Sequence, residues 1–196
     1  MGKLILETQV SLDGFIADKD GGTSWMLWNW GHEWPWDTAL KSYHTDLHKR
    51  ANHIIISSQM AQEGFNAHWQ DAASDPKDTR FEFASHIVKS QKLVVSTTLN
   101  KEVEIPGGWS NCKIIYKELE ETIKKIKTDF PSDIIVYGGA TLASSLISLN
   151  LIDEYHLILN PAAIGQGLRI FNDIVPLKLV NTIPFQCGIA VLHYEK

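Results

Sequence analysis

The stretch "DIIVYGGATLASSL", residues 133–146, carries most of the information about the fold. Apolar and aromatic residues at 134–137 run into Gly138 and Gly139, and a small-residue helix follows at once. In open α/β sheets ligands bind at the carboxyl ends of the strands, where the N-terminus of a helix attracts anions. A Gly-Gly pair also makes an ordinary turn, so this stretch alone leaves a turn and a phosphate site as alternatives.

The rest of the chain alternates strands and helices before it changes character. Apolar runs and alternation predict strands at residues 3–10, 53–56, 92–96, 112–116 and 133–137. Helices are expected at residues 37–50, 57–65, 78–90, 117–130 and 138–150. This alternation is typical of parallel strands with helices on both faces. Three consecutive strands, at 153–165, 178–186 and 188–196, then predict an antiparallel last third.

Composition favours a single soluble domain over residues 1–196. The net charge of −5 argues against a nucleic-acid partner. No apolar run approaches the ~20 residues of a membrane helix, and the N-terminus lacks a signal-peptide pattern. Cys112 and Cys187 both fall in expected strands, where we expect free thiols. We therefore expect a cytoplasmic enzyme or binding protein for a small molecule.

Four motifs in a fixed order give the chain a family resemblance. They are "SLDGFIAD" at 11–18, "LVVSTTL" at 93–99, the stretch 134–161 that contains the two glycines, and "IGQGLRIF" at 164–171. In these motifs and their order the chain resembles the dihydrofolate-reductase-like family. Within that family it is similar to the reductase domain of the riboflavin-biosynthesis deaminase/reductase, the RibD C-terminal domain, and to its free-standing bacterial relatives.

The resemblance implies a fold, a reaction and a set of site residues. The fold is a three-layer α/β/α arrangement around a mixed, mostly parallel sheet of about eight strands with an antiparallel C-terminal part, in a protein that is often a homodimer. The implied reaction is NADPH-dependent reduction of a pterin-like compound or an aminopyrimidine. The implied cofactor-binding residues are Ala17, Ser57, Ser58, Ser96, Thr97, Gly138, Gly139, Ala140 and Thr141.

Roles within this set follow from the same resemblance. Residues 138–141 would hold the cofactor pyrophosphate, Ser96 and Thr97 would lie by the adenosine ribose, and Ala17 would lie near the nicotinamide. Asp13 and Gly14 would border the substrate cleft. Asp13 is the catalytic candidate because a carboxylate can bind a ring N–H and relay a proton. Its alternative role is that of a turn residue before Gly14.

One motif departs from the family pattern. Many relatives have Gly-Arg-x-Thr after the second strand, where this chain has Ser57 and Ser58, and Thr97 stands at an often basic position. A serine hydroxyl cannot replace the charge of an arginine fork on phosphate. The resemblance implies NADPH as the cofactor, and the missing positive charge makes NADH the alternative. A non-catalytic nucleotide-binding or heterocycle-binding protein that retains the reductase fold is the second hypothesis.

The loop after the first motif is rich in tryptophan. Five tryptophans fall within residues 25–36, and Trp25, Trp28 and Trp36 are the substrate-binding candidates. Their flat rings would stack on a planar heterocycle and exclude water. The alternative is that these rings cover an edge of the core or pack at a dimer interface.

A histidine pair on an expected helix is the candidate for a metal site. His44 and His48 stand four residues apart, which is a metal-ligand spacing on a helix. No glutamate follows the first histidine directly, and no third ligand has a motif behind it. We therefore expect solvated histidines and no metal site, and a metal hydrolase that uses this pair is the third hypothesis.

Overall fold

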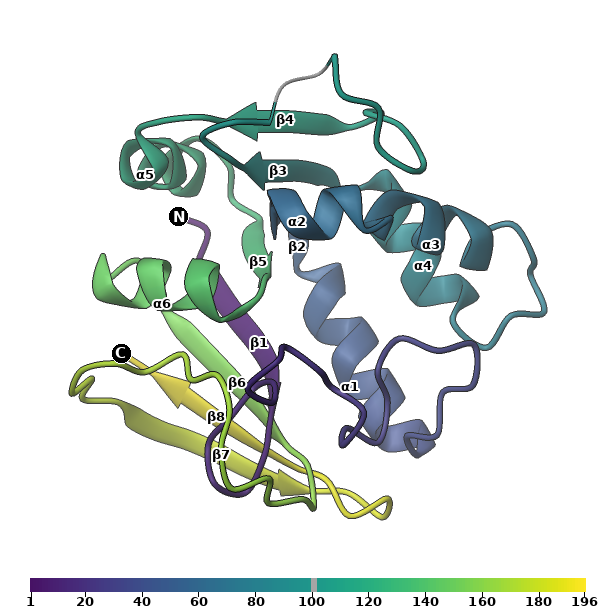
Figure 1. Cartoon of the computed structure of the whole chain (residues 1–196), viewed down its shortest axis with the longest axis vertical. Helices are drawn as coiled ribbons and strands as arrows, with labels where there is room; N and C mark the ends of the chain where they lie inside the picture. The colour runs from purple at the N-terminus through teal and green to yellow at the C-terminus, as the bar shows by residue number, and fades with distance from the viewer. Residues whose placement is uncertain (100–101) are drawn as a thin grey trace. The chain divides into compact units, whose positions relative to one another are not determined.

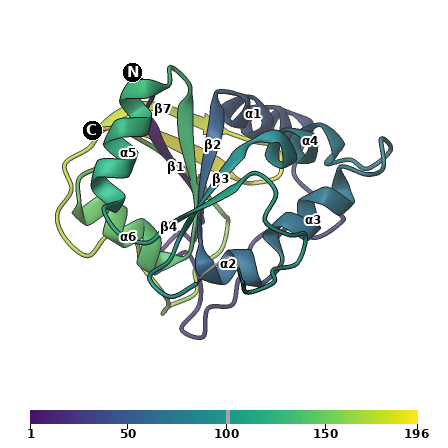
Figure 2. The ribbon, with the colours of Figure 1, turned by 90° about the horizontal axis from the view of Figure 1, so that it is seen from above.

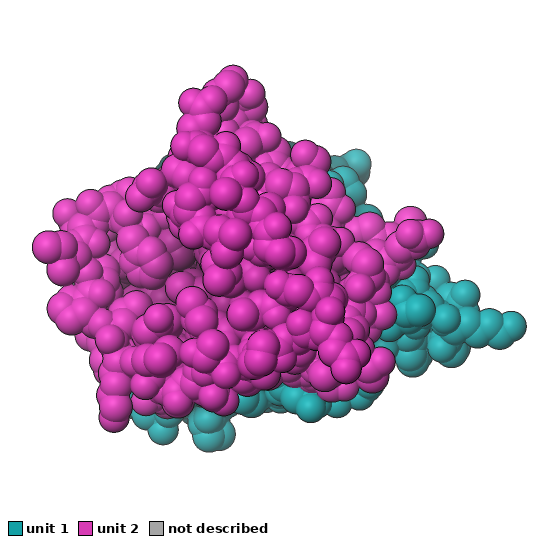
Figure 3. All heavy atoms as spheres, turned by 90° about the horizontal axis from the view of Figure 1, so that it is seen from below, with its two compact units in different colours: residues 1–2, 44–138 teal, residues 3–43, 139–196 magenta. Residues whose placement is uncertain are grey.

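The computed structural model describes residues 1–99 and 102–196. These residues form two compact units, one of residues 1–2 and 44–138 and the other of residues 3–43 and 139–196 (Figure 3). Eight strands within the described residues belong to a mixed sheet, in the order β4-β3-β2-β5-β1-β6-β8-β7. The α/β prediction, with a mixed sheet of about eight strands, is confirmed. The two units are described separately below.

The first unit contains four parallel strands. They are β2 (Ala51–Ser57), β3 (Gln91–Val95), β4 (Cys112–Ile115) and β5 (Asp133–Tyr137), and its helices are α2 (Ser58–Gln62), α3 (Phe65–Ala72), α4 (Phe81–Lys89) and α5 (Leu119–Asp129). Helix α5 lies on one side of these strands, and α3 and α4 lie on the other (Figures 1 and 2). Because helices cover both sides, the central run Ile54, Ile55 and Ile56 is fully buried, as continuous apolar strands require.

The second unit contains the other four strands. They are β1 (Leu4–Val10), β6 (Glu154–Leu159), β7 (Lys178–Pro184) and β8 (Ala190–Glu195), with helix α6 (Ala140–Ser148). Helix α1 (Thr38–Lys49) begins in this unit and ends in the first. Strands β6 and β8 pair antiparallel, as do β7 and β8, but β6 pairs with β1 in parallel. The expectation of a wholly antiparallel last third is therefore wrong for β6, which neighbours the first strand of the chain.

Local structure differs from the sequence prediction at two places. Helix α3 was missed because Gly64, with φ of +103°, ends one helical segment, and a second helix begins at Phe65. Cys187 does not lie in a strand, because it precedes the left-handed Gly188 in the connection between β7 and β8. Both cysteines are free thiols, as expected. Ser57 is the N-cap residue of α2, and its side chain accepts a hydrogen bond from the Met60 N–H.

None of the helices in the described part of the chain combines the length and the apolar character that a membrane span needs.

Candidate functional site

The carboxyl ends of three parallel strands meet at one edge of the first unit. Ser57 lies opposite Val95 in the β2–β3 register, and Ile56 lies opposite Tyr137 in the β2–β5 register. Ser57, Ser96 and Gly138 consequently stand at the same edge, each at the end of its strand or directly after it. The parallel register thus brings together three of the expected cofactor residues, and their contact with a cofactor stays a prediction.

The hydroxyl groups at this edge already stabilise the local backbone. Ser57 Oγ accepts a hydrogen bond from the Met60 N–H at 3.1 Å and caps α2. Ser96 Oγ accepts hydrogen bonds from the backbone N–H groups of Thr98 and Leu99, at 3.2 and 2.9 Å. Each hydroxyl keeps its own hydrogen for donation to a ligand oxygen. The two serines therefore offer neutral donors and no positive charge.

Helix α6 begins with an uncapped and accessible N-terminus in the second unit. Gly139 is its N-cap residue with φ of −70°, and no side chain makes a capping hydrogen bond there. A Cβ placed on Gly139 would have no atom of the described residues within 4 Å. Neither backbone conformation nor space requires glycine, so the residue leaves the N–H groups of the first helical turn open to a ligand. Ala140 and Thr141 form that turn, and this arrangement fits a phosphate group.

Asp13 has hydrogen bonds that fix a turn. Ser11 Oγ donates to Asp13 Oδ1 at 2.6 Å, and the backbone N–H groups of Gly165 and Ile164 donate to Asp13 Oδ2 at 2.7 and 3.1 Å. These bonds, above all the one from Ser11, lower the pKa of Asp13 to about 2. A carboxylate that stays ionised at neutral pH is a poor proton donor. The catalytic role stays a prediction, while the contacts favour the alternative role of a turn residue before Gly14, whose φ is +83°.

Ala17 joins two of the family motifs through the backbone. The N–H of Leu168 donates to the carbonyl of Ala17, and the N–H of Ile16 donates to the carbonyl of Leu168, both at 2.9 Å. A Cβ on Gly167 would lie 2.1 Å from the Ala17 oxygen, so only glycine permits this close approach. The segments 11–18 and 164–171, far apart in sequence, are therefore held side by side, and Ala17 itself is buried.

The tryptophan loop packs largely on itself. The Trp28 ring stacks on Trp34 at 4.6 Å between centroids and meets Trp36 edge-on at 5.0 Å. Trp28 and Trp36 are each only 3% exposed. Gln9 on β1 donates to the Trp28 carbonyl at 2.7 Å and so ties the loop to the sheet. These contacts favour the core alternative for Trp28 and Trp36, while Trp25 is half-buried. Substrate contact by the three rings stays a prediction.

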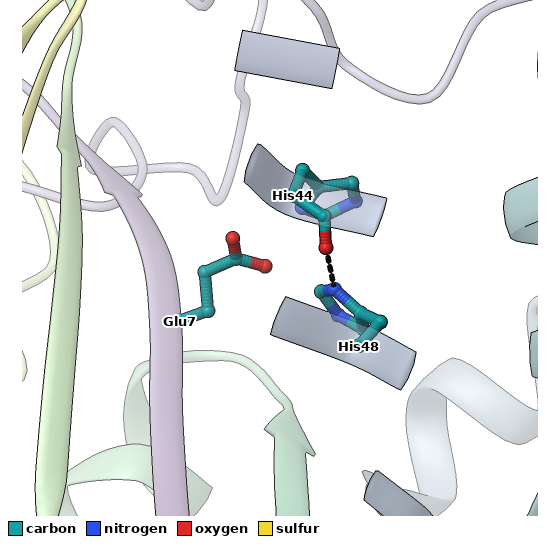
Figure 4. A group of neighbouring side chains, drawn as sticks. All are labelled: Glu7, His44 and His48. Carbon is teal, nitrogen blue, oxygen red and sulfur yellow. Dashed lines mark hydrogen bonds between the residues drawn. The ribbon is translucent and has the colours of Figure 1, made fainter. Parts of the chain in front are cut away.

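His44 and His48 are buried, and the expectation of solvated histidines is wrong. Their exposed fractions are 3% and 1%. His48 Nδ1 donates to the His44 carbonyl at 2.7 Å (Figure 4), and the Tyr137 hydroxyl is hydrogen-bonded to His48 Nε2. The His44 ring packs against Phe83 at 4.4 Å between centroids. The four-residue spacing does place both rings on one helical face, but that face is the inner one.

Burial of His44 makes stability depend on pH. Desolvation by burial lowers the pKa of His44 from its ordinary value of 6.5 to about 3. Below about pH 6.5, His44 binds a proton in the unfolded chain but not in the folded chain. The free energy of unfolding therefore decreases as the pH is lowered. From this residue alone we expect the free energy of unfolding to be about 2 kcal/mol lower at pH 5 than at pH 7.

His44→Phe should remove that part of the slope, which is measured by urea unfolding at both pH values. The comparison uses the slope and not the absolute stability, because the new ring must repack. His32→Phe, at an exposed histidine, is the matched control and should leave the slope as in the wild type. An equal pH dependence in His44→Phe and the wild type would contradict a neutral, buried His44.

A second histidine group was missed by the sequence analysis. Glu154 and His156 on β6 and His193 on β8 bring one ligand atom each within 4.8 Å of the others. The alternation Glu-x-His at 154–156 is the only signal in the sequence, since it puts both side chains on one strand face. The position of His193 depends on strand register, which the sequence does not disclose.

The mixed eight-stranded sheet and the glycine turn at the start of α6 define a protein of the α/β class. The chain belongs to the RibD C-terminal domain family, whose model matches residues 2–191. This confirms the resemblance inferred from the four motifs.

Individual relatives span most or all of the chain. It is 29% identical over 196 residues to the uncharacterized protein YyaP of Bacillus subtilis (strain 168), a match that covers 98% of this chain and 94% of that protein. A pyrimidine reductase-like protein of Corynebacterium diphtheriae has a similar structure, with a TM-score of 0.61, 13% identity, and coverage of 99% and 91%.

A larger protein shares the fold as one of its parts. It is the diaminohydroxyphosphoribosylaminopyrimidine deaminase/5-amino-6-(5-phosphoribosylamino)uracil reductase of Thermotoga maritima, with a TM-score of 0.63 and 15% identity. The match covers 99% of this chain and 56% of that protein. At these identities the solved structures establish the fold of this chain.

Proposed function

We propose that the protein is a nicotinamide-dependent reductase of a small planar heterocycle, either a pterin-like compound or an aminopyrimidine. Membership of the RibD C-terminal domain family supports the class of reaction. The observation that carries the proposal is the open N-terminus of α6, where Gly139 has neither a backbone nor a packing reason to be glycine. We further propose that the protein acts as a cytoplasmic homodimer.

In this proposal the N–H groups of Ala140 and Thr141 bind the cofactor pyrophosphate, with the positive end of the helix dipole behind them. The nicotinamide cofactor supplies the hydride when it is bound. Ser57, Ser58, Ser96 and Thr97 contribute neutral hydrogen-bond donors toward the adenosine part. None of these four side chains carries a positive charge. The 2′-phosphate of NADPH therefore adds little binding free energy compared with the 2′-hydroxyl of NADH.

The second candidate is a binding protein that keeps the reductase fold without catalysis. The observation that favours it is the structural use of the candidate polar groups. Ser57 caps a helix, Ser96 holds a turn, and the Asp13 carboxylate is fixed to backbone N–H groups. A site of this kind can hold a heterocycle and still lack a proton donor for its reduction.

Titration of the full chain with NADPH and with NADH, followed by tryptophan fluorescence, tests the proposal. We expect saturable binding of both, with Kd values in the micromolar range and within about tenfold of each other. Absence of saturation by either cofactor below about 1 mM would refute the reductase. Oxidation of NADPH is then followed at a fixed enzyme concentration with a panel of oxidised pterins and aminopyrimidines. Binding without oxidation across that panel would favour the second candidate.

A further inference from the structure

We propose that Glu154, His156 and His193 form a binding site for a divalent transition-metal ion of the zinc type, which ties strand β6 to strand β8. All three residues lie in the second unit and belong to adjacent strands. None of them is among the residues proposed to bind the cofactor or the substrate, so this site stands independently of the proposed reductase.

Strand register is what assembles the group. His156 lies directly opposite His193 in the antiparallel β6–β8 ladder, and Glu154 is two residues before His156 on the same face of β6. The two imidazole rings stack at 4.2 Å between centroids with 16° between their planes. Cross-strand pairing therefore aims both rings and the carboxylate at one small volume.

The distances between the candidate ligand atoms suit a tetrahedral ion. Glu154 Oε2 lies 3.2 Å from His156 Nε2 and 3.8 Å from His193 Nε2, and all three atoms lie within 4.8 Å of one another. In a tetrahedral zinc site, with bonds of about 2.0–2.1 Å, neighbouring ligand atoms are about 3.4 Å apart. The two observed distances bracket this value, and the stacked rings, whose planes are 16° apart, must turn toward each other for both Nε2 atoms to bind one ion.

Two neighbouring groups hold the ligands in the required orientation. Lys3 Nζ lies 2.5 Å from Glu154 Oε1, so the other oxygen of that carboxylate, Oε2, faces the rings. The Tyr43 hydroxyl lies 2.5 Å from His156 Nδ1 and directs Nε2 toward Glu154. Metal-binding histidines usually bond through their second nitrogen in this way, which fixes the ring and its tautomer. The group thus has the outer contacts of a metal site.

The charges around the group and the chemistry of its ligands also favour a metal cation. Three carboxyl groups, those of Glu7, Glu154 and Glu195, lie on the same sheet face, with Glu7 opposite His156 in the β1–β6 register. Lys3 is the cation paired with two of these groups, Glu154 and Glu195. Two imidazoles with one carboxylate select a transition metal over Ca²⁺ or Mg²⁺, which prefer all-oxygen ligands.

The ligands are also arranged so that an ion could enter. The side chains of Glu154 and His156 are 3% exposed, whereas that of His193 is 18% exposed. The His193 side of the group is therefore the entry path from solvent. Three protein ligands leave the fourth position of a tetrahedral ion for water.

Co²⁺ titration of the untagged, EDTA-treated full chain is the direct test, because tetrahedral Co²⁺ absorbs strongly in the visible range. We expect saturable visible bands at one equivalent, their loss on addition of Zn²⁺, and a Tm higher by roughly 5 °C with saturating Zn²⁺. His193→Phe keeps a flat ring in the stack, and it should weaken Co²⁺ binding by at least about a hundredfold. Tyr43→Phe should weaken it by about tenfold.

His32→Phe removes an exposed imidazole outside the group and is the matched control, with wild-type affinity expected. Circular dichroism of each metal-free variant shows whether it is folded, and Glu154→Gln is the second ligand variant if His193→Phe is not. Absence of Co²⁺ bands and of any Zn²⁺ effect on Tm in the wild type would overturn the proposal. Wild-type affinity in a folded His193→Phe or Glu154→Gln variant would overturn it equally, because the metal would then bind elsewhere.

Discussion

Gly139→Asp should abolish nicotinamide cofactor binding while leaving the protein as stable as the wild type or slightly more stable. Aspartate is a favourable N-cap residue, and its negative charge interacts well with the N-terminus of a helix. The new Cβ has no atom of the described residues within 4 Å, and φ of −70° suits any residue. The new carboxylate, however, takes up the N–H groups of the first turn of α6 and repels a pyrophosphate.

We expect the Kd for NADPH to rise by at least about a hundredfold, since a charge-assisted contact is lost and a repulsion added. The measurement is the same fluorescence titration, together with Tm. Gly139→Ala is the comparison variant, because its methyl group meets no atom of the described residues and brings no charge. It should weaken binding only through its contact with the ligand, and so by clearly less than Gly139→Asp. Unchanged affinity in Gly139→Asp would place the pyrophosphate elsewhere, even if the protein binds NADPH.

Two glycines of this chain illustrate how far a sequence can be read. In the sequence Gly139 and Gly167 have a similar appearance, because each is the second of two closely spaced glycines in a short motif. In the structure Gly167 is required by packing, because a Cβ there would lie 2.1 Å from the Ala17 oxygen, whereas Gly139 is not. The packing reason accounts for Gly167 completely. Packing gives no reason for a glycine at position 139, so a ligand that approaches the backbone there is the better explanation.

Strands that are buried by helices on both sides were predictable from sequence. The run Ile54–Ile56 and the stretch 134–137 are continuously apolar because both of their faces are covered, and each was expected within a few residues of its observed position. Local pattern was sufficient for these strands. The grouping of Ser57, Ser96 and Gly138 at one edge was implied by the family resemblance, and the parallel register of the strands accounts for it.

Features that depend on long-range register or packing were not predictable. His44 and His48 share a face of α1 with Leu40 and Leu47, but helical spacing alone does not show whether the packing covers a polar ring on that face. The pairing of His156 with His193 depends on the β6–β8 register, in which a shift of one residue would move His193 to the opposite face. The stacking of the tryptophan rings on one another also cannot be derived from their spacing in the sequence.

The largest expected loss of stability comes from a buried ion pair in the first unit. The Arg80 side chain is 0% exposed, and Asp78 binds its guanidinium in a bidentate manner, with Nε–Oδ1 at 2.9 Å and Nη2–Oδ2 at 2.6 Å. Asp78→Ala leaves this buried charge without its carboxylate partner, which costs about 3–5 kcal/mol. Urea unfolding at pH 7 measures this change in the free energy of unfolding. Asp46→Ala, which breaks an exposed pair with Lys49, should cost at most about 1 kcal/mol.

A second substitution separates the charge from the shape of the site. If the cost of Asp78→Ala comes from loss of the carboxylate charge beside the buried guanidinium, then adding Arg80→Met should restore part of the lost stability, since a long apolar side chain fills the same space without charge. If the cost comes from the turn before α4, where Asp78 Oδ1 also accepts the Arg80 N–H at 2.7 Å, then Arg80→Met restores nothing. We expect recovery of more than half the loss, because loss of the carboxylate charge beside the buried guanidinium is the larger cost and the turn contributes about 1 kcal/mol.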